Sequence, residues 1–177
     1  MVTQMAYTSS SDLSNVEALI LRLRELANTT IEYGYFGKQY PANDPYGRGG
    51  MNVAEMAITH EYGDPTGKIP LPARPFMAAS YYSYFLNSFN RAFQACCASV
   101  FLGQPVETSI RFITAQMKVS VEFAISNSNF ATLSQWTKDR RAALGIQGDT
   151  PLDATGVLKN SVEIRVNGVV MQSIGGP

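Results

Sequence analysis

Two long amphipathic stretches, separated by a link of only a few residues, constrain the fold more than any other feature of this sequence. Between residues 76 and 102, apolar side chains predict a helix with a seam at i, i+4 spacing formed by Phe85, Phe89, Phe93, Cys96 and Val100. Pro105, favoured at the first position of a helix, opens a second stretch that ends near Ser126. Its apolar face carries Val106, Ile110, Ile113, Met117, Val121 and Ala124. We expect the two helices to pack against each other as a hairpin.

The segment before this hairpin begins with another helix and a strand. Apolar side chains at helical spacing predict a helix that Ser11 or Ser14 caps. It should end near Asn28, a residue that tolerates the left-handed conformation of a helix end. Residues 29–36 are β-branched and aromatic and alternate in polarity, which predicts a strand.

A stretch rich in glycine and proline follows the strand. Residues 37–50 are too dense in Gly, Pro, Asn and Asp for a helix or a central strand, so we expect a long exposed loop that is mobile in the free protein. Asn52 then caps a short helix that Gly63 ends. Residues 64–75 contain four prolines and should be extended, because a residue before proline avoids the α region.

The last third of the chain holds short elements. Residues 133–144 predict a basic amphipathic helix, and residues 152–160 a turn or brief helix. Asn167 and Gly168 lie between two alternating apolar runs, which is a strong signal for a β-hairpin.

Helices and strands are segregated along the chain, and this predicts an α+β fold. We expect a small antiparallel sheet packed against two long helices and shorter helices. Residues 1–12 should form a flexible N-terminal arm, and residues 13–177 a single domain that includes the long loop at 37–50.

Composition favours a protein that contacts other proteins. Charged residues make up 16% of the chain, against about 25% in an average domain. The chain also has 9 Tyr, 9 Phe and 7 Met, and interface centres are depleted in charge and enriched in aromatic residues and Met. A monomer with a neutral surface would have the same composition. The formal net charge is zero and no run of like charge occurs, so the basic footprint of a nucleic-acid-binding protein is missing.

Cysteine usage and hydropathy indicate a cytoplasmic protein. Cys96 and Cys97 are adjacent and no other cysteine is present, so we expect free thiols in a reduced compartment. The N-terminal residues lack the basic and apolar regions of a signal peptide. No apolar run reaches the length of about 18 residues that a membrane span needs.

The sequence contains no catalytic pattern that we can identify. His60, the only histidine, falls on a core-facing helical stripe and is expected to be a satisfied structural residue. No second histidine follows at zinc-protease spacing, and the glycines near Gly47 do not match a phosphate-binding loop. We therefore predict no enzyme activity, no catalytic residue, no metal site and no cofactor.

Three blocks in order carry a family resemblance. They are VAEMAITHEYG at residues 53–63, IPLPARPFM at residues 69–77 and TPLDATGVLKNSVEIRV at residues 150–166. Together they resemble the tail-component and virion-morphogenesis families of tailed bacteriophages, over roughly residues 31–166. LSQWTKDRRAALG is similar to the same families through Leu133, Thr137, Arg140 and Arg141. The chain departs from the family pattern at Leu71 and Pro72, which lengthen the second block, and at Tyr62, where phenylalanine is common.

The resemblance implies a structural protein of the phage virion that acts in tail completion, as a tail terminator or in the neck. It implies a homo-oligomeric ring at the head–tail junction, with six subunits to match the symmetry of phage tails. The implied partners are other neck, connector and tail-tube proteins, with DNA only as cargo passing through the lumen. Assembly would take place in the cytoplasm of the bacterial host. The alternative is a cytoplasmic enzyme or small-ligand binder with an unrecognised site.

Ten residues are candidates for interface or structural roles. Arg74 is held between prolines, so its guanidinium is positioned to bond backbone carbonyls or a carboxylate such as Glu61, within the chain or between subunits. Gly156 should adopt a backbone conformation closed to other residues, and Leu158 should pack in the core. The full set is Tyr40, Tyr46, Arg48, Glu61, Arg74, Phe76, Tyr81, Tyr82, Thr155 and Gly156.

Overall fold

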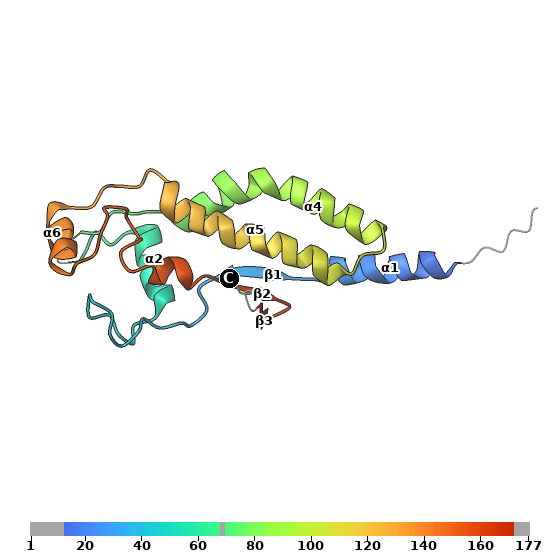
Figure 1. Cartoon of the computed structure of the whole chain (residues 1–177), viewed down its shortest axis with the longest axis horizontal. Helices are drawn as coiled ribbons and strands as arrows, with labels where there is room; N and C mark the ends of the chain where they lie inside the picture. The colour runs from blue at the N-terminus through green and yellow to red at the C-terminus, as the bar shows by residue number, and fades with distance from the viewer. Residues whose placement is uncertain (1–12, 68–69, 172–177) are drawn as a thin grey trace, which may run out of the picture.

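The two helices of the expected hairpin lie side by side along the long axis of the molecule (Figure 1). They are α4 (Leu86–Phe101) and α5 (Val106–Asn127), in a computed structural model that describes residues 13–67 and 70–171. All six residues predicted for the apolar face of α5 are buried, which confirms the hairpin and its register. Pro105 is the N-cap of α5 instead of its first residue, because its ψ of 139° is extended.

The first helix of the hairpin contains a π-helical turn. α3 (Phe76–Ala79), the π-helix η1 (Ser80–Phe85) and α4 follow one another without a break. The predicted seam is wrong at Phe93, whose side chain is 43% exposed, while Ala92 is buried. The reason is helical drift: at 3.6 residues per turn, a residue seven positions after Phe85 returns to the same face, and one eight positions later overshoots it.

The sheet has three antiparallel strands in the order β1-β2-β3. These are β1 (Ile31–Gly34), β2 (Glu163–Val166) and β3 (Val169–Val170). Asn167 and Gly168 connect β2 to β3 with φ values of 51° and 79°, and a type I′ turn needs positive φ at both positions. The predicted hairpin is therefore confirmed, and the chain is α+β as expected.

The sheet packs on the hairpin through its inner face. Ile164 of β2 lies in a core cluster with Phe85 of the π-helix and with Ile113 and Met117 of α5. Two further clusters, one toward each end of α5, complete the core.

α1 (Ser14–Ala27) leaves the body at one end of the molecule (Figure 1). Ser14 is the first residue of this helix and Leu13 its N-cap, and Asn28 has a φ of −91° instead of the expected left-handed value. Asn28 does not adopt the left-handed conformation because the chain continues directly into β1. Its N–H donates to the carbonyls of Arg24 and Leu26. Ser11 and the expected arm at residues 1–12 lie outside the described residues.

The opposite end of the molecule is built from shorter elements. They are α2 (Val53–Tyr62), α6 (Gln135–Ala143), α7 (Val157–Asn160) and the loop at residues 37–50. The Asn52 side chain accepts a hydrogen bond from the Ala54 N–H at 2.8 Å, as predicted for a cap of α2. Among the described residues, no helix has the length and apolar character to cross a membrane.

The end of α2 depends on a glycine. Gly63 has φ 76° and ψ 173°, a combination that essentially only glycine adopts. A Cβ atom at this position would lie 2.7 Å from both the Ala73 nitrogen and the Leu71 oxygen. The glycine therefore lets the segment before α3 pass close beside the end of α2.

We expect Gly63→Ala to lower the free energy of unfolding by at least about 2 kcal/mol, because backbone strain and a steric clash add. Gly37→Ala is the matched control, since Gly37 also has a positive φ, of 84°, but has no atom within 4 Å of the added Cβ. Denaturant unfolding should show a clearly smaller loss for the control. Equal losses in the two variants would contradict the role of close approach at Gly63.

Candidate functional site

Most of the segments that carry the family resemblance meet at the end of the molecule opposite α1, while the third block continues from α7 into β2 nearer the middle (Figure 1). α2, the proline-rich segment after it, α6, and α7 with the residues before it surround a cavity of about 490 Å³. We call this the arginine cavity, and its polar and aromatic lining consists of Tyr40, Tyr46, Arg48, His60, Arg74, Trp136, Thr137, Arg140, Arg141 and Thr155. Five of the ten candidate residues are in this lining: Tyr40, Tyr46, Arg48, Arg74 and Thr155.

The loop at residues 37–50 is a folded wall of this cavity. Most of its residues are exposed, as expected, but Tyr40 and Asp44 are only 4% and 6% exposed. The Asp44 carboxylate accepts hydrogen bonds from the backbone N–H groups of Tyr46 and Arg48, at 3.0 and 3.2 Å. Tyr40 packs in the core cluster with Val53. A buried carboxylate that gathers local N–H groups thus supplies the order that the composition of the loop does not suggest.

Arg48 completes the folding of this loop. Its Nε and Nη2 atoms donate to the two oxygens of Asp44 at 2.9 and 2.8 Å, in a bidentate ion pair. The guanidinium lies over the rings of Tyr40 and Tyr46, with its Cζ atom 4.2 and 4.7 Å from their centroids. Its Nη2 also lies 3.5 Å from the Thr155 hydroxyl, which ties the loop to the residues before α7. Hydrogen bonding from the Arg48 side chain lowers the pKa of Asp44.

Arg74 is an intrachain clamp. It is 4% exposed, and its Nε donates to the Ala131 carbonyl at 3.1 Å. The predicted hydrogen bond from Arg74 to a backbone carbonyl is therefore confirmed. The alternative partner, the Glu61 carboxylate, binds other groups. Burial, with the positive charge of Arg141 nearby, lowers the pKa of Arg74.

Glu61 caps the helix that begins after the proline-rich segment. Its two carboxylate oxygens accept from the backbone N–H groups of Met77 and Ala78, at 2.9 and 3.0 Å. These N–H groups lie in the first turn of α3, where they have no partner within the helix. Phe76, the first residue of α3, is fully buried in the core. Both candidates are therefore folding residues that hold the proline-rich segment against α2.

The remaining candidates lie outside the cavity lining. Tyr81 and Tyr82 are on the π-helix, and they are 39% and 68% exposed, respectively. Gly156 is the N-cap of α7 and has a left-handed φ of 69°, as predicted, and Leu158 is buried in the core.

Sequence reasoning missed several cavity residues on α6. Arg141 is buried, and its Nη1 donates to the carbonyls of Gly148 and Thr150 at 3.0 Å each. Arg140 lies near two aromatic rings, with its Cζ atom 5.7 Å from the Trp136 ring centroid. The segment LSQWTKDRRAALG contains all three residues and belongs to the family resemblance, so the signal was present in the sequence.

His60 does not have the satisfied environment that we expected. Its ring belongs to the cavity lining, and its Nδ1 atom is buried without a hydrogen-bond partner in the described part of the chain. Burial is the main reason that the pKa of His60 falls from 6.5 to about 4, and the charges of Arg74 and Arg48 lower it further. The imidazole is therefore neutral at pH 7. Within residues 13–67 and 70–171, no three His, Cys, Asp or Glu side chains are grouped to hold a metal ion.

We expect Asp44→Asn to lower the free energy of unfolding by about 2–3 kcal/mol at pH 7, because it breaks buried hydrogen bonds to a charged group. The lowered pKa means that ionised Asp44 stabilises the fold above its ordinary value of 3.8, and that this stabilisation is lost at lower pH. The difference between wild type and variant should therefore shrink below pH 3.8. Asp149→Asn is the control, because the Asp149 ion pair with Lys138 is exposed and should contribute under about 1 kcal/mol.

A second pH effect should come from His60. Between pH 6.5 and about 4, the unfolded chain binds a proton at this histidine that the folded chain does not, so the free energy of unfolding should decrease as pH falls through this window. The loss should be on the order of 3 kcal/mol. Urea unfolding of His60→Gln at pH 7, 5.5 and 4.5 should show a flatter profile. Parallel profiles for variant and wild type would refute the buried neutral histidine.

The comparisons with known proteins do not extend the resemblance seen in the sequence blocks. No protein-family model, no curated protein and no solved structure matches this chain. The function is therefore argued from the surfaces and cavities of the molecule itself.

Proposed function

We propose that this chain is a structural protein of a tailed-phage virion that assembles into a ring at the head–tail junction. The ring would join tail to head and let DNA pass through its lumen as cargo. The observation that carries the proposal is the apolar surface at the α1 end of the molecule.

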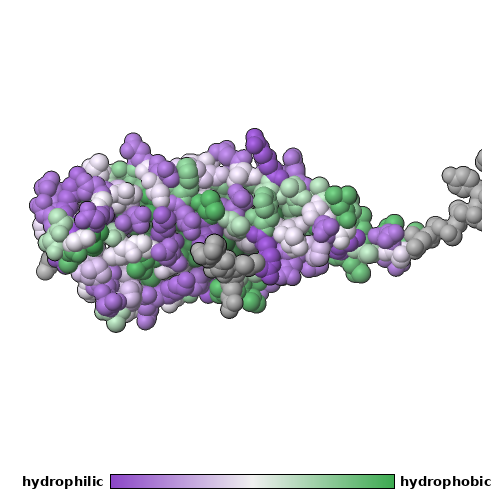
Figure 2. Space-filling view, viewed as in Figure 1, coloured by the Kyte–Doolittle hydropathy of each residue, from purple (hydrophilic) through white to green (hydrophobic). Residues whose placement is uncertain are grey.

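The α1 end exposes several large apolar side chains, and Figure 2 shows green surface there, interspersed with purple polar surface. We call this region the apolar end, and its members are Leu13, Val16, Ile20, Leu21, Phe101 and Leu102. Leu21 is 64% exposed and Leu102, just after α4, is 82% exposed. The Arg22 guanidinium donates to the Gly103 carbonyl at 2.8 Å, which holds α1 beside the tip of the hairpin. Large apolar patches on a protein surface usually mark contacts with other proteins.

α1 also lacks the packing that a helix of its length needs. It has 14 residues, none of them buried. Isolated helices shorter than about 12–15 residues are marginal in water, and most helices in proteins are stabilised by packing of an apolar face. Only one side of α1 packs on the body, through Leu19, Leu23 and Leu26. A neighbouring subunit would supply the missing contacts on the other sides.

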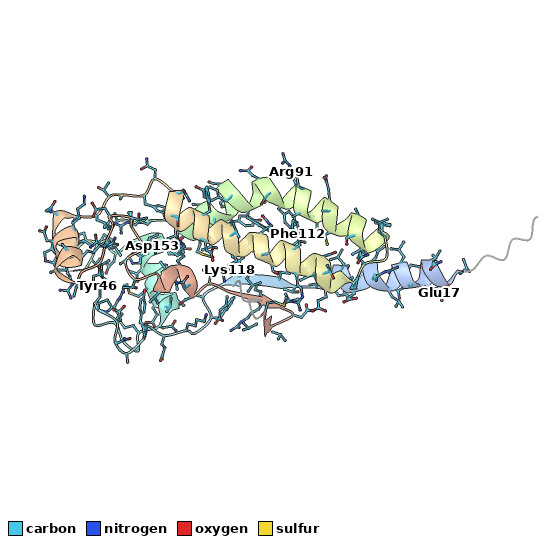
Figure 3. All side chains as sticks on the ribbon, in the orientation of Figure 1. Glu17, Tyr46, Arg91, Phe112, Lys118 and Asp153 are labelled. Atoms are coloured by element: carbon cyan, nitrogen blue, oxygen red, sulfur yellow. The ribbon has the colours of Figure 1, made fainter. Side chains whose placement is uncertain are left out.

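The hairpin offers a second apolar surface that differs from the first. Phe112, Val119 and Phe123 lie along α5 and are about half exposed. They line a groove of about 710 Å³ between α4 and α5, and Figure 3 places Phe112 between these helices. Two different surfaces on one subunit allow head-to-tail contacts, which close into a ring when the rotation between subunits fits. We propose that the apolar end of one subunit occupies the α4–α5 groove of the next.

The phage assignment is supported by the ordered sequence blocks. They resemble tail-component and virion-morphogenesis proteins, and parts of all three line the arginine cavity. The proposed partners are neck, connector and tail-tube proteins, and the proposed location is the head–tail junction of a virion assembled in the bacterial cytoplasm. Six subunits would match the symmetry of the tail.

The ring is tested by native mass spectrometry and electron microscopy of the wild type and of two variants. Ile20→Asp at the apolar end and Val119→Asp in the groove each place a charge in the proposed contact. Both should shift the protein from a six-subunit ring to the monomer while the thermal melting of the monomer fold is retained. Ile58→Asp is the matched control, because Ile58 is an exposed apolar residue of α2 outside both surfaces. A wild type that stays monomeric at high concentration, or forms a two-fold dimer, would contradict the proposal.

A further inference from the structure

The arginine cavity contains polar atoms that the protein leaves unsatisfied. In the described part of the chain, six buried side-chain nitrogen or oxygen atoms have no hydrogen-bond partner. Three of them belong to residues that line this one cavity: the hydroxyl of Tyr46, Nδ1 of His60 and Nε of Arg141. Buried polar groups without partners are rare in native proteins and usually bond ordered water or a ligand, so three of them at one cavity mark it as a place where such a molecule binds.

The lining also carries positive charge without matching carboxylates. Four arginines face the cavity, and among the described residues only Arg48 has an acidic partner, Asp44. Within residues 13–67 and 70–171, the side chains of Arg74 and Arg141 donate to backbone carbonyls and to no carboxylate. Arg140 lies over two aromatic rings and forms no ion pair with a described residue. Three guanidinium groups at one cavity repel each other unless an anion lies between them.

The rest of the wall is apolar. Met56, Leu71, Leu133 and the ring of Trp136 line the same space. A volume of about 490 Å³ is in the range of cavities that hold small organic groups. A ligand that fits both parts of the lining has an anionic end and an apolar body.

We propose that the arginine cavity binds a carboxylate that carries an apolar or aromatic group. Nη1 of Arg141 already bonds two carbonyls, so its free Nε–H and the Tyr46 hydroxyl are single donors that match the two oxygens of a carboxylate. A phosphate group presents three acceptor oxygens, one more than these two donors match. The carboxylate comes from a free organic acid or from the end of a peptide. The inference is independent of the proposed ring, since none of its residues belongs to the apolar end or the α4–α5 groove.

The chemistry of the ligand is tested with defined probes on the full chain. Isothermal titration calorimetry with N-acetyl-phenylalanine should show binding. The amide of the same compound, which lacks the charge, should bind at least about 10-fold more weakly. Inorganic phosphate should not compete with the acid. Equal binding of acid and amide, or binding of phosphate in place of the acid, would overturn the proposal.

Tyr46→Phe removes only the unpartnered hydroxyl. We expect the melting temperature of the unliganded variant to equal or exceed that of the wild type, because a buried polar group without a partner is lost. Its affinity for N-acetyl-phenylalanine should nevertheless fall about 10-fold. A purely structural role of Tyr46 would give the reverse pattern, a lower melting temperature with unchanged affinity, and would rule out this site.

Arg140→Gln should also lower the affinity for N-acetyl-phenylalanine about 10-fold, because it removes a guanidinium charge from the cavity. Arg91→Gln is the control, because Arg91 lines the α4–α5 groove and lies on α4 far from Tyr46 in Figure 3. The affinity of this variant should equal that of the wild type. Unchanged affinity in Arg140→Gln would count against the cavity as the binding site.

A hexapeptide that ends in phenylalanine with a free carboxyl group identifies the source of the carboxylate. Tighter binding than that of N-acetyl-phenylalanine indicates the end of a peptide, and weaker binding indicates a free organic acid. Ile20→Asp should leave all these affinities unchanged.

Discussion

The apolar face of α5 is the constraint on which the rest of the structure depends. Each of the three core clusters contains residues of this helix: Val106 and Ile110 at its start, Ile113 and Met117 in the middle, Val121 and Ile125 near its end. At about 1.5 Å per residue, its 22 residues span about 33 Å. α1, α3, the π-helix, α4, α7, β1 and β2 all pack against this helix, so the molecule is long and its two ends are built from different parts of the chain. The arginine cavity occupies one end and the apolar end the other.

Much of the fold could be predicted where the physical cause is local. The 3.6-residue period predicted the buried face of α5, and the φ requirements of a tight turn predicted the hairpin at Asn167 and Gly168. The errors occurred where packing decides the outcome. Phe93 was placed in the core by a spacing of four that drifts from the helical period. The loop at 37–50 is largely exposed, as its composition predicts, but composition does not reveal that Tyr40 and Asp44 are buried or that the Asp44 carboxylate orders the loop through hydrogen bonds.

The candidate site was predictable only in part, because sequence spacing does not show which segments meet. The family resemblance pointed to Arg74, and the loop supplied Arg48 and Tyr46, without any indication that all three line one cavity. Arg140 and Arg141 were within a matched segment, but a basic helix face is usually solvated, and the burial of Arg141 follows from its bonds to the carbonyls of the following loop. The same limit applies to His60: its helical stripe indicated burial, and only the tertiary structure shows that its Nδ1 has no partner.

The length of α5 has a consequence for how this protein can change. Substitutions more than about 7–10 Å apart with no shared partner have additive effects on stability. The arginine cavity and the apolar end share no side chain and are separated by much of a helix of about 33 Å. Variation at one end is therefore energetically uncoupled from the other. A lineage of such chains can vary the lining of the cavity while the apolar end stays the same, so the two surfaces are free to evolve at different rates.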